Sequence, residues 1–376
     1  MNLLLVNYME TTAPGGINRV VQEIGAGLIR RGHDVTVLQA NPADLPTEEM
    51  FNGFKIIRVK SSVARFLYDL NPATYLYLKK NLARLNPDVV HVHGYASLFP
   101  WEIMRFLRDI TCPVAFSPHY DIQSHDTLAG KHLWSVFNKA IGNHSYSAAD
   151  KVICASRFES ENVKRDFGVA EDRIEVVPHG VARIETARRP PRDTKQITLL
   201  YYGWLLELKG VQYILEAQLK LQQAFGKGTT LNIIGDGNFK SALIKLAREL
   251  RIQSSISWYP FLPEGELYER IKAADMCLLL SRSENFGITV AEALALKVPC
   301  IVARTTALTE FLDEPGCFGV TYPPDSTELA ELIIQVKDDD PDVGPLSDRI
   351  RTWDQVVTDY EKLYAGLLRE TVEPSR

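Results

Sequence analysis

Short apolar runs alternate with longer stretches of helical periodicity along the first part of the chain. Residues 3–7 are mostly apolar, residues 17–31 carry apolar side chains at helical spacing up to Gly32, and residues 34–38 form a second run that is rich in apolar residues. This order predicts a strand, a helix and a second strand in one βαβ unit. Further strands are expected at residues 55–59, 88–92, 113–116 and 151–154, with helices between most of them. The alternation predicts a parallel, doubly wound sheet.

The pattern is interrupted between Val176 and Thr194, where proline and charged residues replace the apolar ones. We interpret this segment as an interdomain linker. Beyond it the alternation restarts, with strands expected at residues 197–202, 231–234, 256–258, 276–280 and 299–302. The last helical pattern, residues 353–368, has an apolar face that must pack on one of the two domains. The second half therefore predicts another doubly wound α/β domain.

Length, charge and cysteine content narrow the class of protein. A chain of 376 residues exceeds the usual size of one hydrophobic core, which favours two domains. The net charge of −5 argues against nucleic acid as a partner, because binding the phosphate backbone requires a basic surface. Residues 1–7 lack a basic start and a cleavage site, so they predict a buried strand and a cytoplasmic protein. The 5 cysteines include no Cys-x-x-Cys pair, and we expect buried, reduced thiols.

Two carboxylates bracket an apolar turn between Ser283 and Glu292. Glu284 is expected on the loop that follows the apolar run 274–280, and Glu292 in the first turns of the next helix. Open α/β sheets bind ligands at such loops, outside the carboxyl ends of strands and beside helix N-termini. From spacing alone, two solvated glutamates of an ordinary crossover are the favoured interpretation, since acidic residues are common in first helical turns.

Two glycine-rich turns and one lysine are candidates for anion binding. Pro14-Gly15-Gly16 lies between the first expected strand and helix, and Gly235-Asp236-Gly237 follows a strand of the second domain. Both are weak signals, since a simple turn has the same sequence, and neither contains the full Gly-x-Gly-x-x-Gly pattern of nicotinamide enzymes. Lys209, beside Gly210 at a helix start, is placed to contact phosphate oxygens, although a lysine is more often a solvated surface charge.

Three histidines and an acidic run are candidates for metal-binding or catalytic groups. His91 and His93 share one face of a strand but lack further ligands at suitable spacing, which favours a structural role. His119 follows the strand ending at Phe116, a position that suits a polar contact to a reacting group. The run at residues 338–340 precedes a proline and predicts a solvated loop and not a metal site.

Together these segments resemble a retaining glycosyltransferase of family 4, among the group 1 glycosyltransferases with the GT-B fold. The resemblance covers nearly the whole chain, and its specificity comes from the number, order and spacing of segments that are individually weak. The matching segments are Pro14-Gly15-Gly16, Arg31 to Val35, Pro87 to His93, His119, Ala149 to Ser156, Val177 to Val181, Lys209-Gly210, Gly235-Asp236-Gly237, Glu284 to Gly287 and Glu292.

The resemblance implies a fold and a reaction. Two Rossmann-like domains would face each other across a cleft: residues 1–185 with the helix at 353–370 on the acceptor side, and residues 195–350 binding the nucleotide sugar. A hexosyl unit would move, with retention, from a UDP- or GDP-type sugar to a glycan or lipid-linked acceptor. No metal or cofactor is implied. Peripheral association with the inner face of a membrane and the oligomeric state stay open.

The resemblance also implies residue roles. Glu284 would hold hydroxyls of the donor sugar, Lys209 would neutralise the diphosphate, and His119 would lie near the primary hydroxyl of the sugar and the reacting carbon. Glu292 would accept from the ribose, and backbone groups at Leu262 would contact the base. The implied donor-binding residues are Gly15, Gly16, Trp204, Leu262, Asn285, Phe286, Gly287, Ile288 and Glu292.

Three positions depart from the family pattern. Trp204 stands where an arginine usually clamps the diphosphate, Lys297 stands where glycine is usual, and Thr306-Ala307 replaces a Gly-Gly pair ahead of Glu310. Either the cation of Lys297 or another arginine from elsewhere in the chain would offset the lost contacts. Otherwise the enzyme is slow, uses an unusual donor or is an inactive sugar-nucleotide-binding protein. A GT-B-type sugar-nucleotide 2-epimerase is a further alternative. The loop at residues 120–131 is expected to shape acceptor choice.

Overall fold

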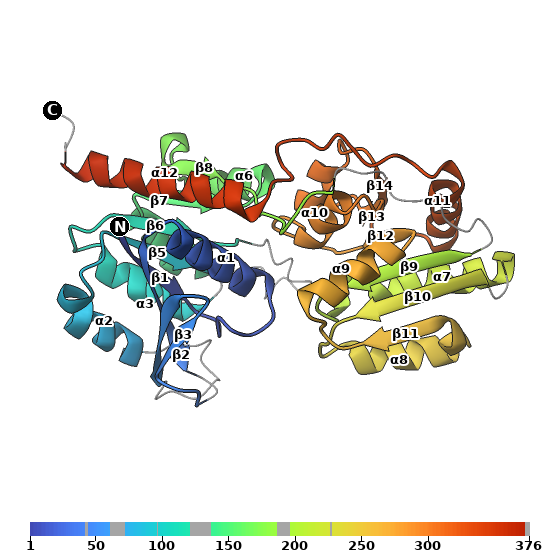
Figure 1. Ribbon diagram of the computed structural model, residues 1–376, viewed down its shortest axis with the longest axis horizontal. Helices are drawn as coiled ribbons and strands as arrows, with labels where there is room; N and C mark the ends of the chain where they lie inside the picture. The colour runs from blue at the N-terminus through green and yellow to red at the C-terminus, as the bar shows by residue number, and fades with distance from the viewer. Residues whose placement is uncertain are drawn as a thin grey trace. The chain divides into compact units, whose positions relative to one another are not determined.

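The chain folds into two compact units, drawn in Figure 1. The computed structural model describes residues 1–41, 44–60, 72–95, 97–120, 137–185, 196–225 and 228–372. Unit 1 consists of Met1–His179 and Trp353–Arg376, and unit 2 of Gly180–Thr352.

Unit 1 is built on a sheet with the order β3-β4-β2-β1-β5-β6-β7-β8. The neighbouring strands pair in parallel, except that β3 pairs with β4 in the antiparallel sense. β1 lies in the interior, where five of its six residues are buried, which explains its continuous apolar sequence. The strands are β1 (Asn2–Asn7), β2 (Asp34–Asn41), β3 (Glu48–Phe51), β4 (Phe54–Lys60), β5 (Val89–His93), β6 (Val114–Ser117), β7 (Lys151–Cys154) and β8 (Ile174–Val176).

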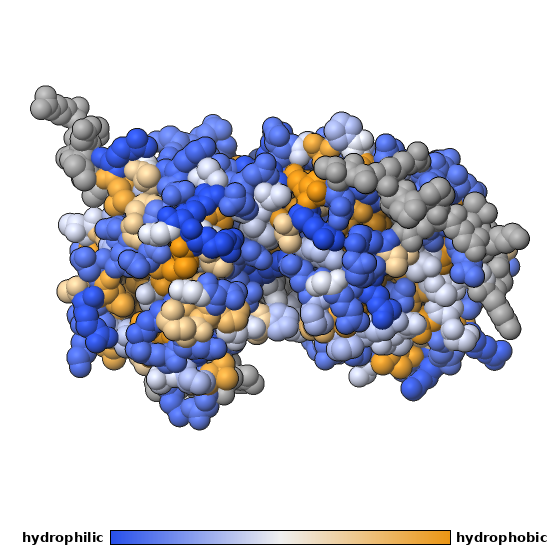
Figure 2. Space-filling model, viewed as in Figure 1, coloured by the Kyte–Doolittle hydropathy of each residue, from blue (hydrophilic) through white to orange (hydrophobic). Residues whose placement is uncertain are grey.

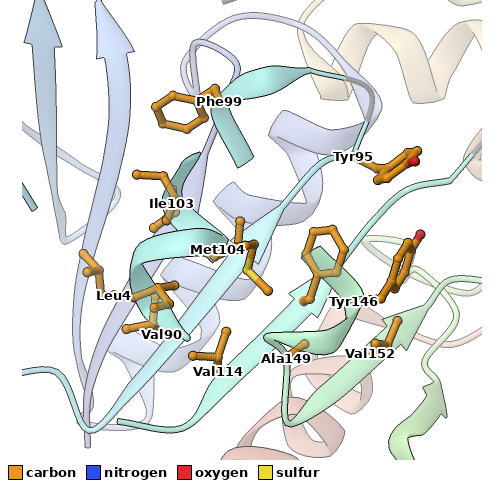
Figure 3. Close-up of a cluster of buried hydrophobic side chains, with 14 of the residues drawn as sticks. Leu4, Val90, Tyr95, Phe99, Ile103, Met104, Val114, Tyr146, Ala149 and Val152 are labelled. Atoms are coloured by element: carbon orange, nitrogen blue, oxygen red, sulfur yellow. The ribbon is translucent and has the colours of Figure 1, made fainter. Parts of the chain in front are cut away.

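Helices cover this sheet and bury its apolar side chains. Figure 3 shows one such cluster, in which side chains of β1, β5, β6 and β7 meet those of α3 and α5. Its labelled members are Leu4, Val90, Tyr95, Phe99, Ile103, Met104, Val114, Tyr146, Ala149 and Val152. The helical elements of unit 1 are α1 (Gly16–Arg30), α2 (Pro72–Leu85), α3 (Leu98–Leu107), the π-helical η2 (Asn138–Gly142), α5 (Asn143–Ser147), α6 (Arg157–Phe167), the 3₁₀ turn η3 (Glu171–Arg173) and α12 (Trp353–Val372).

The last helix, α12, returns to unit 1 and packs beside α1 (Figure 1). The approach is close because α1 carries a glycine at the contact: a Cβ on Gly27 would lie 2.5 Å from Cγ2 of Val357. At the end of α1, Arg31 donates to Asp354 at 2.9 Å and to Glu361 at 3.1 Å. The apolar face predicted for this helix is therefore buried on unit 1.

Unit 2 is a second parallel sheet, with the order β11-β10-β9-β12-β13-β14. Its strands are β9 (Ile197–Tyr202), β10 (Thr229–Ile234), β11 (Ile256–Tyr259), β12 (Met276–Leu279), β13 (Cys300–Ala303) and β14 (Cys317–Val320). Its helical elements are η4 (Glu207–Lys209), α7 (Val211–Phe225), α8 (Lys240–Glu249), η6 (Gln253–Ser255), α9 (Glu264–Ala273), α10 (Ile288–Ala295), η7 (Thr306–Phe311) and α11 (Ser326–Asp339).

The predicted α/β class with two doubly wound sheets is confirmed, and the differences lie at edges and connections. The sequence did not predict β3, β8 or β14. The acidic run at 338–340 begins inside α11 and is not a loop, and Asp340 caps the helix in the left-handed region. In the segment interpreted as a linker, Val177 and Val181 are buried, and residues 186–194 lie outside the described part.

The described surface is mostly hydrophilic. Figure 2 shows one face, on which hydrophobic residues form small areas separated by hydrophilic ones. Among the described residues, the exposed large hydrophobic side chains are those of Met50, Leu76, Val176 and Trp204. None of the helices in the described ranges combines the length and apolar character that a bilayer crossing requires.

Candidate active site

The loop between β12 and α10 holds Glu284 in a fixed position in unit 2. Ser281 donates its hydroxyl to Oε1 of Glu284 at 2.8 Å, and the backbone N–H of Glu284 donates to Oγ1 of Thr306 at 2.9 Å. Gly287 then adopts φ 103, in the left-handed region, and caps the start of α10. Since glycine adopts this conformation at little cost, the turn brings the loop directly into the helix.

Lys209 forms an ion pair with Glu284, with 2.6 Å between Nζ and Oε1. The side chains are 20% and 16% exposed, so the pair is accessible but mostly enclosed. A left-handed glycine makes this approach possible, because a Cβ on Gly210 would lie 2.1 Å from the carbonyl oxygen of Leu280. The structure thus brings together, at the ends of β9 and β12, the lysine and the first glutamate that the sequence predicted.

Glu292 is buried in α10 and surrounded by tyrosines. It is 2% exposed, and its two carboxylate oxygens lie 3.0 Å from the hydroxyl of Tyr202 and 3.3 Å from that of Tyr268. Burial, and then the charge of Glu292, raise the pKa of Tyr202 well above its usual value, so this tyrosine stays protonated. Glu292 therefore belongs to a hydrogen-bonded cluster beneath the loop that carries Glu284.

Trp204 presents an exposed indole on the loop that follows β9. The residue is 38% exposed, and its ring packs edge-to-face on Phe261 with 5.0 Å between centroids. The backbone of this loop is held by the Gly235-Asp236-Gly237 turn, because Leu205 donates to the carbonyl of Asp236 at 2.8 Å. Leu262, predicted to contact the base, directly follows Phe261 and is partly buried.

The departures at Lys297 and Thr306 have a backbone explanation. Both residues adopt the left-handed region, with φ 63 and φ 42, where glycine is the residue with least strain. The ammonium of Lys297 donates to the carbonyl of Val343 at 2.7 Å. The hypothesis that Lys297 supplies the missing cation near the phosphates stays a prediction, because one hydrogen bond to a carbonyl leaves further donors on the ammonium. Glu310 forms an ion pair with Arg349.

In unit 1, His119 follows β6 in a left-handed conformation, with φ 49. Its Nε2 lies 3.3 Å from Nδ1 of His93, and burial lowers the pKa of His119 to about 4. Gly15 has φ 155 and precedes α1, whereas a Cβ on Gly16 would meet nothing within 4 Å. Of the loop expected to shape acceptor choice, residues 121–131 lie outside the described part.

The loop between β1 and α1 is held by a polar network that the sequence did not reveal. Arg58 of β4 has a fully buried side chain and contacts both carboxylate oxygens of Glu10, at 3.0 and 3.1 Å. Gln39 of β2 donates to the same carboxylate at 2.6 Å. Burial raises the pKa of Glu10, but the bonds from Arg58 and Thr12 outweigh it and leave that pKa below its ordinary value.

Several residues that contact Glu284 or Glu292 could not be identified from the sequence. Ser281, Thr306, Tyr202 and Tyr268 come from four different segments, and only the fold shows their contacts. For Thr306 the sequence did offer a signal, because a threonine stands there at a position where glycine is usual. Within the part of the chain that the structure describes, no group of three or more His, Cys, Asp or Glu side chains is arranged to hold a metal ion.

Comparison with known proteins identifies the family. The model described as Glycosyltransferase Family 4 matches residues 14–183, and the one described as Glycosyl transferases group 1 matches residues 183–352. A glycogen synthase from Mycobacterium tuberculosis is 28% identical over 373 residues, covering 90% of this chain and 86% of that protein.

Solved structures show the fold. Sucrose-phosphate synthase from Thermosynechococcus elongatus has a TM-score of 0.79 at 17% identity, covering 98% of this chain and 100% of the other. Anabaena HepE in complex with UDP and glucose has a TM-score of 0.68 at 16% identity, covering 100% of this chain and 99% of the other. The GT-B fold accounts for both parallel sheets. Because the two family models together match residues 14–352, this chain belongs to the family 4, group 1 glycosyltransferases.

Proposed function

We propose that the protein transfers a hexosyl unit, with retention of configuration and without a metal ion, from a nucleoside diphosphate sugar to a glycan or lipid-linked acceptor in the cytoplasm. The observation that carries the proposal is the ion pair of Lys209 and Glu284, held at the carboxyl ends of β9 and β12. Ligands bind at these ends of parallel sheets. HepE, which has a similar fold, was solved with UDP-glucose, which supports a donor of this class.

Glu284 is proposed to hold hydroxyls of the donor sugar. Its contacts to described residues, from Lys209 and Ser281, both go to Oε1. Oε2 therefore retains its capacity to accept from a ligand hydroxyl. The loop residues Asn285, Phe286 and Gly287, with Ile288 at the first position of α10, are proposed to add backbone contacts. A carboxylate that is already oriented loses little conformational entropy on binding, which favours precise placement of the sugar.

Lys209 is proposed to bind the diphosphate. An ammonium has three donors, so it can keep Glu284 and still bind a phosphate oxygen. When the bond between the anomeric carbon and the phosphate oxygen breaks, negative charge grows on the phosphate, and the lysine stabilises that charge. The acceptor oxygen forms the new bond on the same face, and its proton passes to the departing phosphate oxygen. This scheme retains configuration and requires no enzyme nucleophile.

The remaining sites contribute to donor binding in this proposal. His119 contacts the primary hydroxyl of the sugar, Glu292 accepts from the ribose, and backbone groups at Leu262 contact the base. Glu292 can serve the ribose while its tyrosine contacts persist, because a carboxylate has about four acceptor positions. Gly15 and Gly16, at the start of α1, offer backbone N–H groups to the diphosphate or acceptor.

A thermal-shift panel of UDP- and GDP-sugars with EDTA present tests donor binding. A true donor at 100 times its dissociation constant should stabilise the protein by about 2.7 kcal/mol. The donor identified in this way is then incubated with glycan and glycolipid acceptors, and the anomeric configuration of the product is read by NMR. We expect transfer with retention in EDTA. Inversion, or activity only after a metal is added, would overturn the mechanism.

The departure at Trp204 favours one competing function, an inactive binding protein. An inactive binder would be stabilised by donor yet show neither transfer nor donor hydrolysis. A 2-epimerase would convert the donor with no acceptor present. Transfer that depends on the acceptor excludes both alternatives.

A further inference from the structure

Among the histidines that the structure describes, His91, His93, His119 and His179 gather in unit 1 near the ends of β5 and β6. Neighbouring ring centroids are separated by 4.0 Å between His91 and His93, 5.6 Å between His93 and His119, and 5.7 Å between His119 and His179. The proposed function uses only His119. The cluster therefore raises the question of what the buried histidines do for it.

All four rings are neutral at physiological pH. Burial lowers the pKa of His91 to about 3, that of His119 to about 4 and that of His179 to about 3, and it holds that of His93 well below the usual value. A neutral imidazole carries one proton, on either Nδ1 or Nε2, and accepts at the other nitrogen. Each ring is thus in one of two tautomers, and its neighbours select between them.

The contact between His93 and His119 requires one donor. Nδ1 of His93 lies 3.3 Å from Nε2 of His119, so either ring could donate. The other nitrogen of His93, Nε2, has no hydrogen-bond partner among the described residues, and the residue is 0% exposed. A buried N–H without an acceptor is rarer and more costly than an acceptor that goes unused. The proton of His93 is therefore favoured on Nδ1.

His91 does not offer His93 an alternative partner. Its Nδ1 lies 2.7 Å from the hydroxyl of Tyr364 and its Nε2 lies 2.9 Å from that of Ser117, so both ring nitrogens are engaged. The ring of His91 packs on that of His93 and helps to fix its orientation. His93 is left with a single polar contact among these residues, the one to His119.

We propose that His93 is a positioning residue that donates from Nδ1 to Nε2 of His119 and so holds His119 as the Nδ1–H tautomer. His119 then carries its proton on Nδ1, so any ligand that contacts this nitrogen must offer a hydrogen-bond acceptor such as a hydroxyl oxygen. The strained backbone of His119, at φ 49, is consistent with a side chain held for function. The identity of that oxygen, the primary hydroxyl of the donor sugar, rests on the proposed function; the tautomer does not.

The tautomer can be read directly in the wild-type protein. Long-range ¹H–¹⁵N correlation spectra of ¹⁵N-histidine-labelled protein distinguish protonated from unprotonated ring nitrogens. Signals are assigned by loss in His119→Asn and His93→Asn. His33, whose Nε2 lies 2.7 Å from a carboxylate oxygen of Glu361, provides a reference for protonated Nε2. We expect protonated Nδ1 and unprotonated Nε2 in both His93 and His119. A protonated Nε2 in His119 at neutral pH would overturn the proposal.

Kinetics provide a second test with a matched pair of variants. In His93→Asn the amide nitrogen takes the place of Nδ1, whereas His93→Leu has no donor. With a hexose donor, the leucine variant should lose about tenfold in kcat/KM and the asparagine variant should keep most activity. With a 6-deoxyhexose donor, which lacks the primary hydroxyl, the two variants should have the same kcat/KM. Equal losses in the two variants with the hexose donor would mean a merely structural role. So would a leucine variant that loses as much activity with the 6-deoxyhexose donor as with the hexose donor. A wild-type protein without transfer activity would refute the proposed function, and the spectra would still decide the tautomer.

Discussion

At the scale of single residues, Thr306 shows how a side chain other than glycine is accommodated in the left-handed region by a local contact. Thr306 is a β-branched residue in the left-handed region, an unusual combination, and its hydroxyl accepts from the backbone of Glu284. The sequence showed that a threonine replaced a glycine, but not that it contacts Glu284. That contact joins segments 22 positions apart and depends on the fold.

Thr306→Val tests this contact. Valine has nearly the same shape but no acceptor, so the backbone N–H of Glu284 loses its partner. We expect the free energy of unfolding to fall by about 1–3 kcal/mol and sugar transfer to weaken, as measured by urea denaturation and initial rates. Thr306→Ser keeps the hydroxyl and should retain most of both. If valine and serine behaved alike, the hydroxyl would have no role.

Trp204→Arg tests the prediction that the indole lies beside the donor diphosphate. An arginine there would add a charge-assisted hydrogen bond to phosphate, so donor affinity measured by calorimetry should rise about tenfold and depend more steeply on salt. Trp204→Phe, which adds no charge, should leave the salt dependence unchanged. An arginine variant with the wild-type affinity and salt dependence would show that this position lies away from the phosphates.

At the scale of elements, the sequence predicted the buried strands well and the edges poorly. β1, β9 and β12 are continuous apolar runs because both of their faces are covered, which gives a strong signal. β3, with the sequence Glu-Glu-Met-Phe, has no buried residue, and its pairing with β4 defines it. The edge strand β8 is likewise unburied. Such strands form through hydrogen bonds to a neighbour, which local hydrophobicity does not encode.

Two glycines test the packing of α12 on unit 1. Gly27→Ala should improve helix propensity, yet its Cβ would lie 2.5 Å from Cγ2 of Val357. We expect a net loss of about 1–3 kcal/mol from overpacking. Gly366→Ala on α12 is the matched control: its Cβ would meet nothing within 4 Å, so it should gain about 0.5–1 kcal/mol. Denaturation midpoints compare the two, and a stabilising Gly27→Ala would contradict the close contact.

The network at the β1–α1 loop predicts a pH dependence. Since the folded pKa of Glu10 lies below its ordinary value of 4.5, its charged form stabilises the fold above that pH. This contribution is lost as pH falls through the folded pKa. The stability gap between wild type and Glu10→Gln should therefore be large at pH 7 and shrink in acid, as followed by urea denaturation. A gap that stays constant with pH would contradict the role of the carboxylate.

At the scale of the whole molecule, each unit holds its own set of candidate site residues. Unit 2 holds Lys209 and Glu284 beyond the carboxyl ends of β9 and β12, and unit 1 holds His119 among buried histidines. The sequence could predict these residues because loops after buried strands are recognisable. The proposed roles of the site residues remain predictions. The supporting residues Ser281, Tyr202 and Tyr268 could not be predicted, since their contacts arise only when distant strands and helices pack together.

The most direct test of the central claim is the turnover of Glu284→Gln with the identified donor and acceptor. Glutamine keeps the size of the side chain and removes the charge that pairs with Lys209 and that is proposed to accept from the sugar. We predict that kcat/KM falls by about a hundredfold or more, equivalent to about 2.7 kcal/mol, while the unfolding transition stays close to that of wild type. Glu331→Gln, on an exposed position of α11, serves as the control. Full turnover by the folded Glu284→Gln variant would contradict the account.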